Sequence, residues 1–251
     1  MERKVDNLQV QVYANRAIMG RAAAKDVQQA VAKVLESKDE VNIIFAAAPS
    51  QMDLYEGLLE LDIPWSRINA MHMDEYTGLE ASNTQSFRYY LKKNLFEKVP
   101  FKNIHYIQGE NEDIEGECLR YSEILNDFKP DIVCMGIGEN THIAFNDPPV
   151  ADFNDPKLVK KVELDHMCRQ QQVNDGCFPT INDVPTHALT LTIPALLGAS
   201  YIFCIVPAAT KAQAVYLTLN EEITEKHPST ILRRHPQAKL YLDPDSSKLL
   251  K

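Results

Sequence analysis

Apolar runs rich in β-branched residues alternate along the chain with segments whose apolar residues recur every three or four positions. The segment 86–99 shows the helical pattern, with apolar side chains on one face at Phe87, Tyr90, Leu91 and Leu95. Strands are predicted at 41–48, 68–73, 103–108, 131–138, 187–193, 201–207 and 238–243. Helices are predicted at 51–62, 86–99, 111–128, 210–224 and 229–235.

Strands separated by helices of this length indicate parallel pairing, because a parallel connection needs a crossover of a dozen or more residues. We therefore predict an α/β fold: one doubly wound, mostly parallel sheet with helices on both faces, in a single domain over 1–251. Ligands of such sheets bind beyond the carboxyl ends of the strands. The segment 147–185 is rich in Asp, Asn, Gln and Pro and has no clear period, which is typical of a functional lid-like loop.

Composition narrows the function classes. The chain of 251 residues is 45% hydrophobic and carries a net charge of −9, as expected of a soluble globular protein without the basic stripe of a nucleic-acid binder. No apolar run reaches the length of a membrane span, and the start has no signal-peptide pattern. Five widely spaced cysteines without a CxxC pair indicate reduced thiols and a cytoplasmic location. The histidines show no metal-ligand spacing, so we expect no metal site.

Two acids follow the predicted strand 68–73. A carboxylate at the end of a strand, half-buried by the sheet, can have its pKa raised enough to exchange protons near neutral pH, and Asp74 and Glu75 stand there. The alternative is that both are ordinary loop acids or a helix cap. The residues alone favour this second interpretation slightly.

Two helix starts could bind an anion. Ser50 could cap the helix beginning at Gln51, with Asp53 completing a capping box, or the same amide groups could hold a phosphate. Thr210 resembles a cap that puts Lys211 in the first helical turn, where a cation opposes the helix dipole by roughly 0.3 to 1 kcal/mol. An anion between Lys211 and the free amides would make that arrangement favourable. A solvated surface lysine is the simpler alternative for Lys211 taken by itself.

The loop after strand 131–138 begins like a dinucleotide-binding fingerprint, with Gly136 and Gly138, and then departs from it. A fingerprint must run into a helix, whereas this loop continues into Asp147 and two prolines. His142 is a candidate general acid and base, because polar and acidic residues, Asn140 and Asp147, lie near it in the sequence. We therefore interpret the loop as catalytic.

Four stretches together, MDEYTGL, GIGENTHIAFNDPP, VPTHALTLTIPALLGA and STILRRHPQA, resemble the glucosamine-6-phosphate deaminase (glucosamine-6-phosphate isomerase) family, which shares its fold with 6-phosphogluconolactonases. The resemblance covers nearly the whole chain. It implies that a phosphorylated amino sugar is isomerised and deaminated to fructose 6-phosphate and ammonia, without a cofactor. It also implies a homo-oligomer.

The resemblance gives each motif residue a role. Asp74 matches the carboxylate that moves a proton between substrate carbons 1 and 2, and His142 matches the group that helps to open the sugar ring. Asp147 stands where the family has the glutamate that completes the histidine's relay, and Asn140 precedes the histidine in the same motif. The substrate-binding residues implied are Ser50, Gln51, Glu75, Arg169 and Lys211.

Three departures from the family pattern bear on these roles. The acid that usually precedes the histidine is the neutral Asn140, unless Glu139 takes its place. The phosphate loop lacks its usual glycines, and Arg169 is the lone arginine of the lid-like segment and therefore the candidate lid ligand for phosphate. The chain also ends before the tail that some relatives use in an allosteric site, so we do not expect allosteric control.

Two other functions stay open. A lactone-phosphate hydrolase would share the fold, the phosphate site and the histidine, although lactonases follow the strand acid with Glu-Arg where this chain has Glu75-Tyr76. A non-catalytic sugar-phosphate-binding protein is the third possibility, because of Asn140 and the missing glycines.

Overall fold

A computed structural model describes residues 2–250 and contains an eight-stranded sheet with the order β1-β2-β11-β10-β7-β3-β4-β6. Its strands are β1 (Glu2–Val5), β2 (Leu8–Val12), β3 (Val41–Phe45), β4 (Ile68–His72), β6 (Asn103–His105), β7 (Ile132–Met135), β10 (Tyr201–Val206) and β11 (Ala238–Leu242). Every neighbouring pair is parallel except β1 with β2. The predicted, mostly parallel α/β sheet is confirmed.

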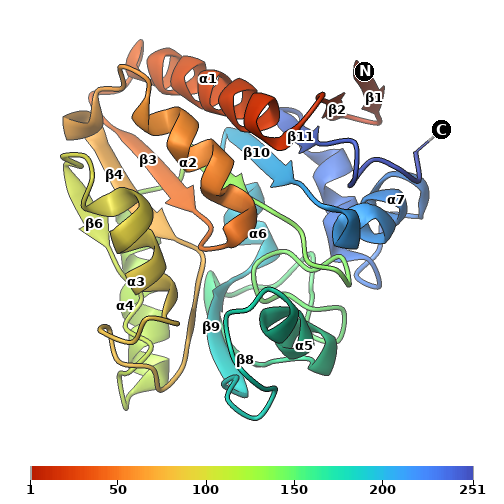
Figure 1. Ribbon diagram of the computed structural model, residues 1–251. Coiled ribbons are helices and arrows are strands. Elements are labelled where there is room, and N and C mark those ends of the chain that lie inside the picture. The colour runs from red at the N-terminus through yellow and green to blue at the C-terminus, as the bar shows by residue number, and fades with distance from the viewer. Residues whose placement is uncertain (1, 251) are drawn as a thin grey trace.

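Helices cover both faces of this sheet (Figure 1). One face carries α1 (Arg16–Leu35), α2 (Met52–Leu59) and α3 (Phe87–Leu91), which continues as a π-helical turn over Lys92–Phe96. The other face carries α4 (Ile114–Asp127), α6 (Ile193–Leu197) and α7 (Ala212–Asn220). Each face therefore has its own buried apolar cluster, as a doubly wound fold requires.

Helix α1 was not predicted, because its buried face consists largely of small side chains such as Ala23, Ala24 and Ala30. Its start is capped by the Asn15 side chain, which accepts from the Ile18 amide at 2.9 Å. It crosses α2 at very short range, since a Cβ at Gly20 would lie 2.4 Å from the Asp53 backbone. This packing places the beginning of α1 beside the turn that precedes α2.

A second, antiparallel sheet lies beyond the carboxyl ends of the parallel strands and has the order β5-β9-β8. Its strands are β5 (Asp74–Tyr76), β8 (Val159–Glu163) and β9 (His187–Leu191). The predicted strand 187–193 thus belongs to this sheet. The segment 147–185, expected to lack regular structure, instead contains β8 and the helix α5 (His166–Asn174). Its period is hidden because the buried residues of the edge strand β8, Val159 and Val162, do not alternate with exposed ones, and because α5 buries few side chains.

The register of the large sheet brings four strand ends together. Phe45 at the end of β3 pairs with His72 of β4 and with Cys134 of β7, and Cys204 of β10 pairs with Met135 of β7. The loops that follow these strands therefore start from one edge of the sheet. Figure 1 shows β8, β9 and α5 on the side toward which the β3 arrow points.

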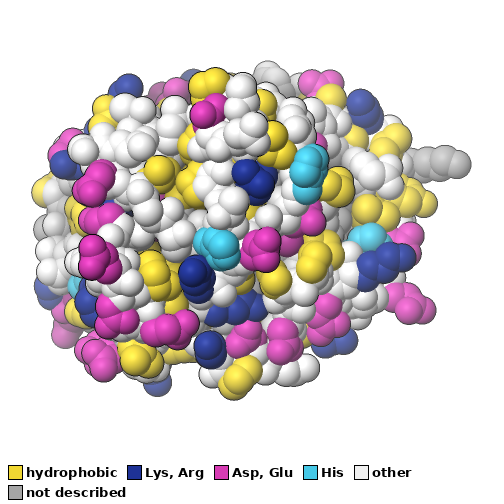
Figure 2. Space-filling model, turned by 90° about the horizontal axis from the view of Figure 1, so that it is seen from below, with side chains coloured by type: hydrophobic (Ala, Val, Ile, Leu, Met, Phe, Trp, Pro, Cys, Tyr) yellow, Lys and Arg dark blue, Asp and Glu magenta, His cyan; other side chains and the backbone are white. Residues whose placement is uncertain are grey.

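Two observations bear on the expectation that the protein has no nucleic-acid or membrane partner. Figure 2 shows positive and negative side chains interspersed over one face, with no continuous basic band there. Among residues 2–250, no helix combines the length and the apolar character that crossing a bilayer requires.

Candidate active site

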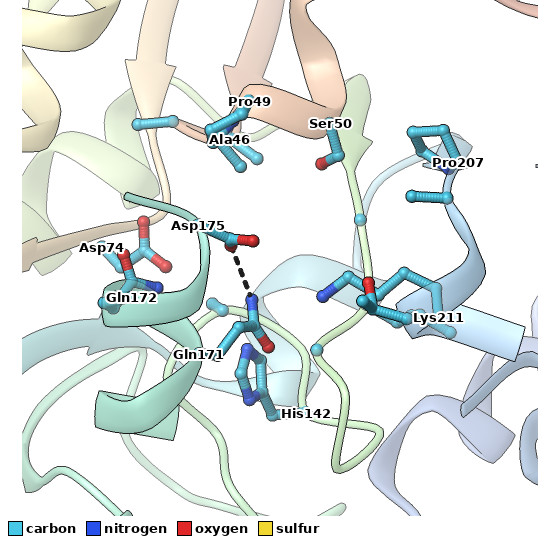
Figure 3. A pocket seen from close by; sticks show the side chains of 18 of the residues that line it. Ala46, Pro49, Ser50, Asp74, His142, Gln171, Gln172, Asp175, Pro207 and Lys211 are labelled. Atoms are coloured by element: carbon cyan, nitrogen blue, oxygen red, sulfur yellow. Dashed lines mark hydrogen bonds between the residues drawn. The ribbon is translucent and has the colours of Figure 1, made fainter. Parts of the chain in front are cut away.

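One cavity opens where the loops after β3, β4, β7 and β10 meet, and helix α5 closes one side of it (Figure 3). It measures about 840 Å³ including its open mouth, within the usual range for small-ligand sites. Four of the predicted site residues line it: Ser50, Asp74, His142 and Lys211. They follow the ends of four different strands, β3, β4, β7 and β10, so only the folded topology brings them together.

The carboxyl group of Asp74 is nearly buried, with 7% of the residue exposed. Burial, followed by the charge of Glu75, raises the pKa of Asp74 well above its ordinary value. Behind it, the buried His72 ring fixes the backbone: its Nε2 accepts from the Ile107 amide, so Nδ1 carries the proton and donates to the Asp74 carbonyl at 2.9 Å. Burial lowers the pKa of His72 to about 3, which keeps this ring neutral.

His142 lies beside a buried carboxylate. Its Nδ1 is 2.9 Å from Oδ1 of Asp147, although an Nδ1–H would be poorly aligned with that oxygen. Asn140 donates through Nδ2 to the same oxygen at 2.9 Å and accepts from the His142 amide at 3.1 Å. Burial alone would raise the pKa of Asp147, but the imidazole and the Asn140 amide outweigh it and hold that pKa below its ordinary value.

One glycine of this loop makes room for the histidine ring. A Cβ at Gly138 would come within 2.2 Å of the His142 ring, so the ring occupies the space of a side chain at that position. Two residues around His142 have left-handed backbone angles, with φ of 72° at Thr141 and 50° at Ala144. Such angles cost about 1–3 kcal/mol each in non-glycine residues and are commonest at functional sites.

Lys211 enters the cavity from the opposite side to Asp74 (Figure 3). It is 7% exposed, and within residues 2–250 it forms no ion pair at 4 Å or less. Burial lowers its pKa, against the opposing effects of Asp175 and Glu139. The predicted cap at Thr210 is wrong: the turn starts at Ala208, with φ of 83°, and no side chain caps it.

The turn at Ser50 is likewise uncapped, so the capping-box interpretation is wrong. Asp53 instead forms an ion pair with Arg16, Oδ2 to Nη2 at 2.7 Å. Gln51 is fully buried and does not line the cavity. Its Nε2 donates to the Ile205 carbonyl at 3.2 Å and to Ser50 Oγ at 3.1 Å, which ties this turn to β10.

Two further predicted substrate-binding residues, besides Gln51, lie outside the cavity wall. Glu75 is fully buried, and its carboxylate accepts hydrogen bonds from the amides of Tyr76, Phe87 and Arg88. Adjacent residues of a strand face opposite sides, so Glu75 points away from the cavity that Asp74 lines. The Arg169 guanidinium donates to the carbonyls of Ile181 and Val184 at 2.6 and 3.0 Å. These contacts point it into the segment after α5 rather than toward a ligand.

The cavity wall also contains residues that the sequence did not single out. Arg16 lines it from the start of α1, and Gln171, Gln172 and Asp175 line it from α5 and its end. Gln171 accepts from the Glu139 amide at 2.9 Å and donates to Asp175 at 3.4 Å, so α5 is joined to the histidine loop (Figure 3). Asn15 is a residue typical of a helix N-cap, and it could have predicted a helix that begins at Arg16.

One group of side chains could hold a metal ion. Single ligand atoms from His142, Asp147 and Cys168 lie within 4.8 Å of one another. The sequence hid this group because the three residues come from the histidine loop and from helix α5.

Comparisons with known proteins bear on the chemistry of this cavity. Residues 14–241 match the model of a family described as glucosamine-6-phosphate isomerases/6-phosphogluconolactonase. A glucosamine-6-phosphate deaminase of Bacillus cereus (strain G9842) is 33% identical over 219 residues, which are 87% of this chain and 82% of that protein. A glucosamine-6-phosphate deaminase of Streptococcus pneumoniae serotype 4 is 34% identical over 82% of this chain and 86% of that protein.

Solved structures agree with the architecture. A monomeric glucosamine-6-phosphate deaminase superposes with a TM-score of 0.87 at 25% identity, over 96% of this chain and 99% of that one. A 6-phosphogluconolactonase from Thermotoga maritima gives a TM-score of 0.76 at 20% identity, over 94% of this chain and 99% of that one. The second likeness supports the fold only.

Proposed function

The chain belongs to the family of glucosamine-6-phosphate isomerases and 6-phosphogluconolactonases, and we propose that it converts glucosamine 6-phosphate, with water, to fructose 6-phosphate and ammonia. The observation that carries the proposal is the shared cavity. It is lined by a buried carboxyl at Asp74, an imidazole at His142 and the ammonium of Lys211, which has no ion-pair partner within residues 2–250. Isomerisation of a phosphorylated amino sugar needs these three kinds of group.

The substrate phosphate binds near Lys211. A buried cation without a carboxylate partner is costly by itself, and a phosphate supplies the missing charge. Ser50 and its uncapped turn lie on the same cavity wall and offer a hydroxyl and amide groups to the phosphate oxygens. Arg16 adds a second positive charge at this end of the cavity.

His142 opens the sugar ring by moving a proton from the hydroxyl of carbon 1 to the ring oxygen. Asp147 beside Nδ1 stabilises the imidazolium that forms, at a contact distance of 2.9 Å. Asn140 holds the Asp147 carboxylate and thus acts as a positioning residue rather than as a second relay acid. We assign no relay role to Glu139, because its amide donates to Gln171 at 2.9 Å and its charge acts on Lys211.

Asp74 then takes the proton from carbon 2 and returns it to carbon 1, while a proton from the substrate's nitrogen passes to the oxygen of carbon 1. The amino aldehyde thereby becomes a ketimine with a hydroxyl on carbon 1. The raised pKa of Asp74 suits a group that must alternate between both protonation states near neutral pH. Water adds to the ketimine at carbon 2, and ammonia leaves. These proton transfers use side chains of the cavity and the substrate's own nitrogen.

Lactone hydrolysis is the second candidate, because the family and the fold include lactonases. It would use His142 and the phosphate site but would need no proton transfer at carbon 2. Assays of ammonia release and of lactone hydrolysis, run side by side on the purified protein, separate the two functions. Ammonia from glucosamine 6-phosphate supports the proposal, and lactone hydrolysis without ammonia release rejects it.

Two expectations remain predictions. A homo-oligomer was expected, whereas one similar structure is described as monomeric, so the oligomeric state stays a prediction. The cytoplasmic location rests on the thiols, and all five cysteines are free in the structure.

A further inference from the structure

Asp147 and Cys168 lie behind His142 and do not line the substrate cavity. Asp147 instead lines a second cavity, of about 600 Å³ including its open mouth, together with Glu163, Asp165 and His166. Cys168 is 1% exposed and lies on α5, next to this group. The back of the histidine pair thus has its own surroundings and its own opening.

We propose that His142, Asp147 and Cys168 bind a thiol-seeking divalent cation, with Zn²⁺ as the representative, and that this ion inhibits the enzyme from behind the substrate cavity. Their ligand atoms lie within 4.8 Å of one another. In a tetrahedral zinc site, with bonds of about 2.0–2.3 Å, ligand atoms are about 3.4–3.6 Å apart. A shift of about 1 Å, by rotation of the Cys168 side chain or movement of α5, therefore suffices to close the site.

Two ligand atoms of the group lack a hydrogen bond of good geometry. Oδ2 of Asp147 is buried and only weakly satisfied within residues 2–250, by the nearby Asp165 amide and Cys168 thiol, and Nδ1 of His142 has no well-aligned partner there. Asp147 itself is 1% exposed, so this carboxylate is largely removed from bulk solvent. Imidazole, carboxylate and thiolate form a ligand set that zinc accepts.

The local charge favours a dication. The Asp147 and Asp74 carboxylates lie close enough to the Cys168 thiol to act on it electrostatically. The same carboxylates attract a metal ion. On binding, the ion displaces the thiol proton, which leaves to solvent, and a metal–sulfur bond forms without any change of oxidation state.

Access and the fourth ligand come from the second cavity. Its wall carries the acidic side chains of Glu163 and Asp165 beside Asp147, which would draw a cation inward. A water molecule from this side can complete the tetrahedron.

The kinetic consequence rests on the proposed function. An ion on Nδ1 and on the Asp147 carboxylate removes the relay that serves ring opening, while Lys211, Ser50 and Asp74 stay available to the substrate. Inhibition should therefore lower kcat and leave KM nearly unchanged. A metal that bound in the substrate cavity would raise KM instead.

The test uses Co²⁺ as a spectroscopic probe on reduced, metal-free protein. We expect a thiolate-to-cobalt charge-transfer band that disappears in Cys168→Ala and is abolished by added Zn²⁺. Cys177→Ala is the matched control, because Cys177 is a more accessible thiol of the same segment. Cys168→Ser, which keeps the volume of the side chain, covers the case in which the alanine variant does not fold.

Zinc titration of the deaminase activity is the second measurement. Cys168→Ala or Cys168→Ser should need about tenfold or more Zn²⁺ for half-inhibition, with unchanged activity in the absence of metal. The inference is overturned if the wild-type protein shows no charge-transfer band, if the band survives loss of Cys168, or if it disappears with Cys177. Because the band needs no turnover, it tests the site even if the protein has no deaminase activity.

Discussion

The imidazole ring of His142 lies against the α-carbon of Gly138, where a Cβ would come within 2.2 Å of the ring. The glycine that makes the loop resemble a nucleotide-binding fingerprint therefore makes room for a histidine. The same loop holds the ring through the Asn140–Asp147 contacts.

Gly138→Ala should displace the ring and lower kcat about tenfold or more, because a misplaced general acid and base loses most of its contribution of 10²–10⁴-fold. KM should change little, since the phosphate contacts lie elsewhere. Gly198→Ala is the control, because its Cβ would meet only ordinary contacts at 3.4 Å and beyond. Steady-state kinetics decide, and wild-type kcat in Gly138→Ala would contradict this account of the loop.

Lys211→Gln should reduce kcat/KM for the phosphorylated sugar by about 10–100-fold, the loss of a charge-assisted hydrogen bond worth about 1.5–3 kcal/mol. Lys25→Gln, at an exposed position of α1, should leave kcat/KM unchanged. Inorganic phosphate, tested as a competitive inhibitor, should also bind more weakly to Lys211→Gln. Equal inhibition of both variants by phosphate would show that Lys211 is not the phosphate ligand.

The two arginines near the cavity should behave differently. Arg169→Gln should lower the free energy of unfolding by about 1–3 kcal/mol, because the carbonyls of Ile181 and Val184 lose a charged donor. Its KM should stay near that of the wild type. Arg16→Gln should raise KM, since Arg16 lines the cavity. Urea unfolding and steady-state kinetics measure these effects. A raised KM with unchanged stability in Arg169→Gln, and an unchanged KM in Arg16→Gln, would instead support Arg169 as the phosphate ligand.

Asp74 should make the protein less stable as pH rises. Its pKa in the folded state is raised above the ordinary value of 3.8, so the native protein holds a proton that the unfolded chain releases. The stability of the wild type therefore falls as pH increases from the ordinary carboxyl pKa toward the folded one. Asparagine does not titrate, so the free energy of unfolding of Asp74→Asn should not show this decrease. It should exceed the wild-type value at pH 7.5 and exceed it by less at pH 4.5. Urea unfolding at both values measures the two differences, and a difference that does not grow with pH would contradict the raised pKa.

Much of the site could be predicted because parallel strands end at one edge of a sheet. Asp74, His142 and Lys211 each follow a different strand, and the order of those strands brings them to one cavity. Glu75 could have been excluded in the same way, since neighbours on a strand face opposite sides.

Other features depend on packing that a linear pattern does not encode. Arg16 reaches the cavity because α1 crosses α2 at Gly20, and the alanine-rich face of α1 gave no clear period. Arg169 and Cys168 lie on α5, whose few buried side chains concealed both the helix and the directions of its residues. The second sheet was hidden for a related reason, because its edge strand β8 exposes charged residues.

The most direct test of the proposed chemistry is turnover of glucosamine 6-phosphate by Asp74→Asn, measured as ammonia release beside the exchange of the proton at carbon 2 with deuterated solvent. The amide keeps the shape of the carboxyl but cannot carry the proton. We predict that both rates fall about 10²–10⁴-fold while the phosphorylated sugar still binds. A variant that releases ammonia and exchanges that proton at nearly the wild-type rate would contradict the assignment of Asp74.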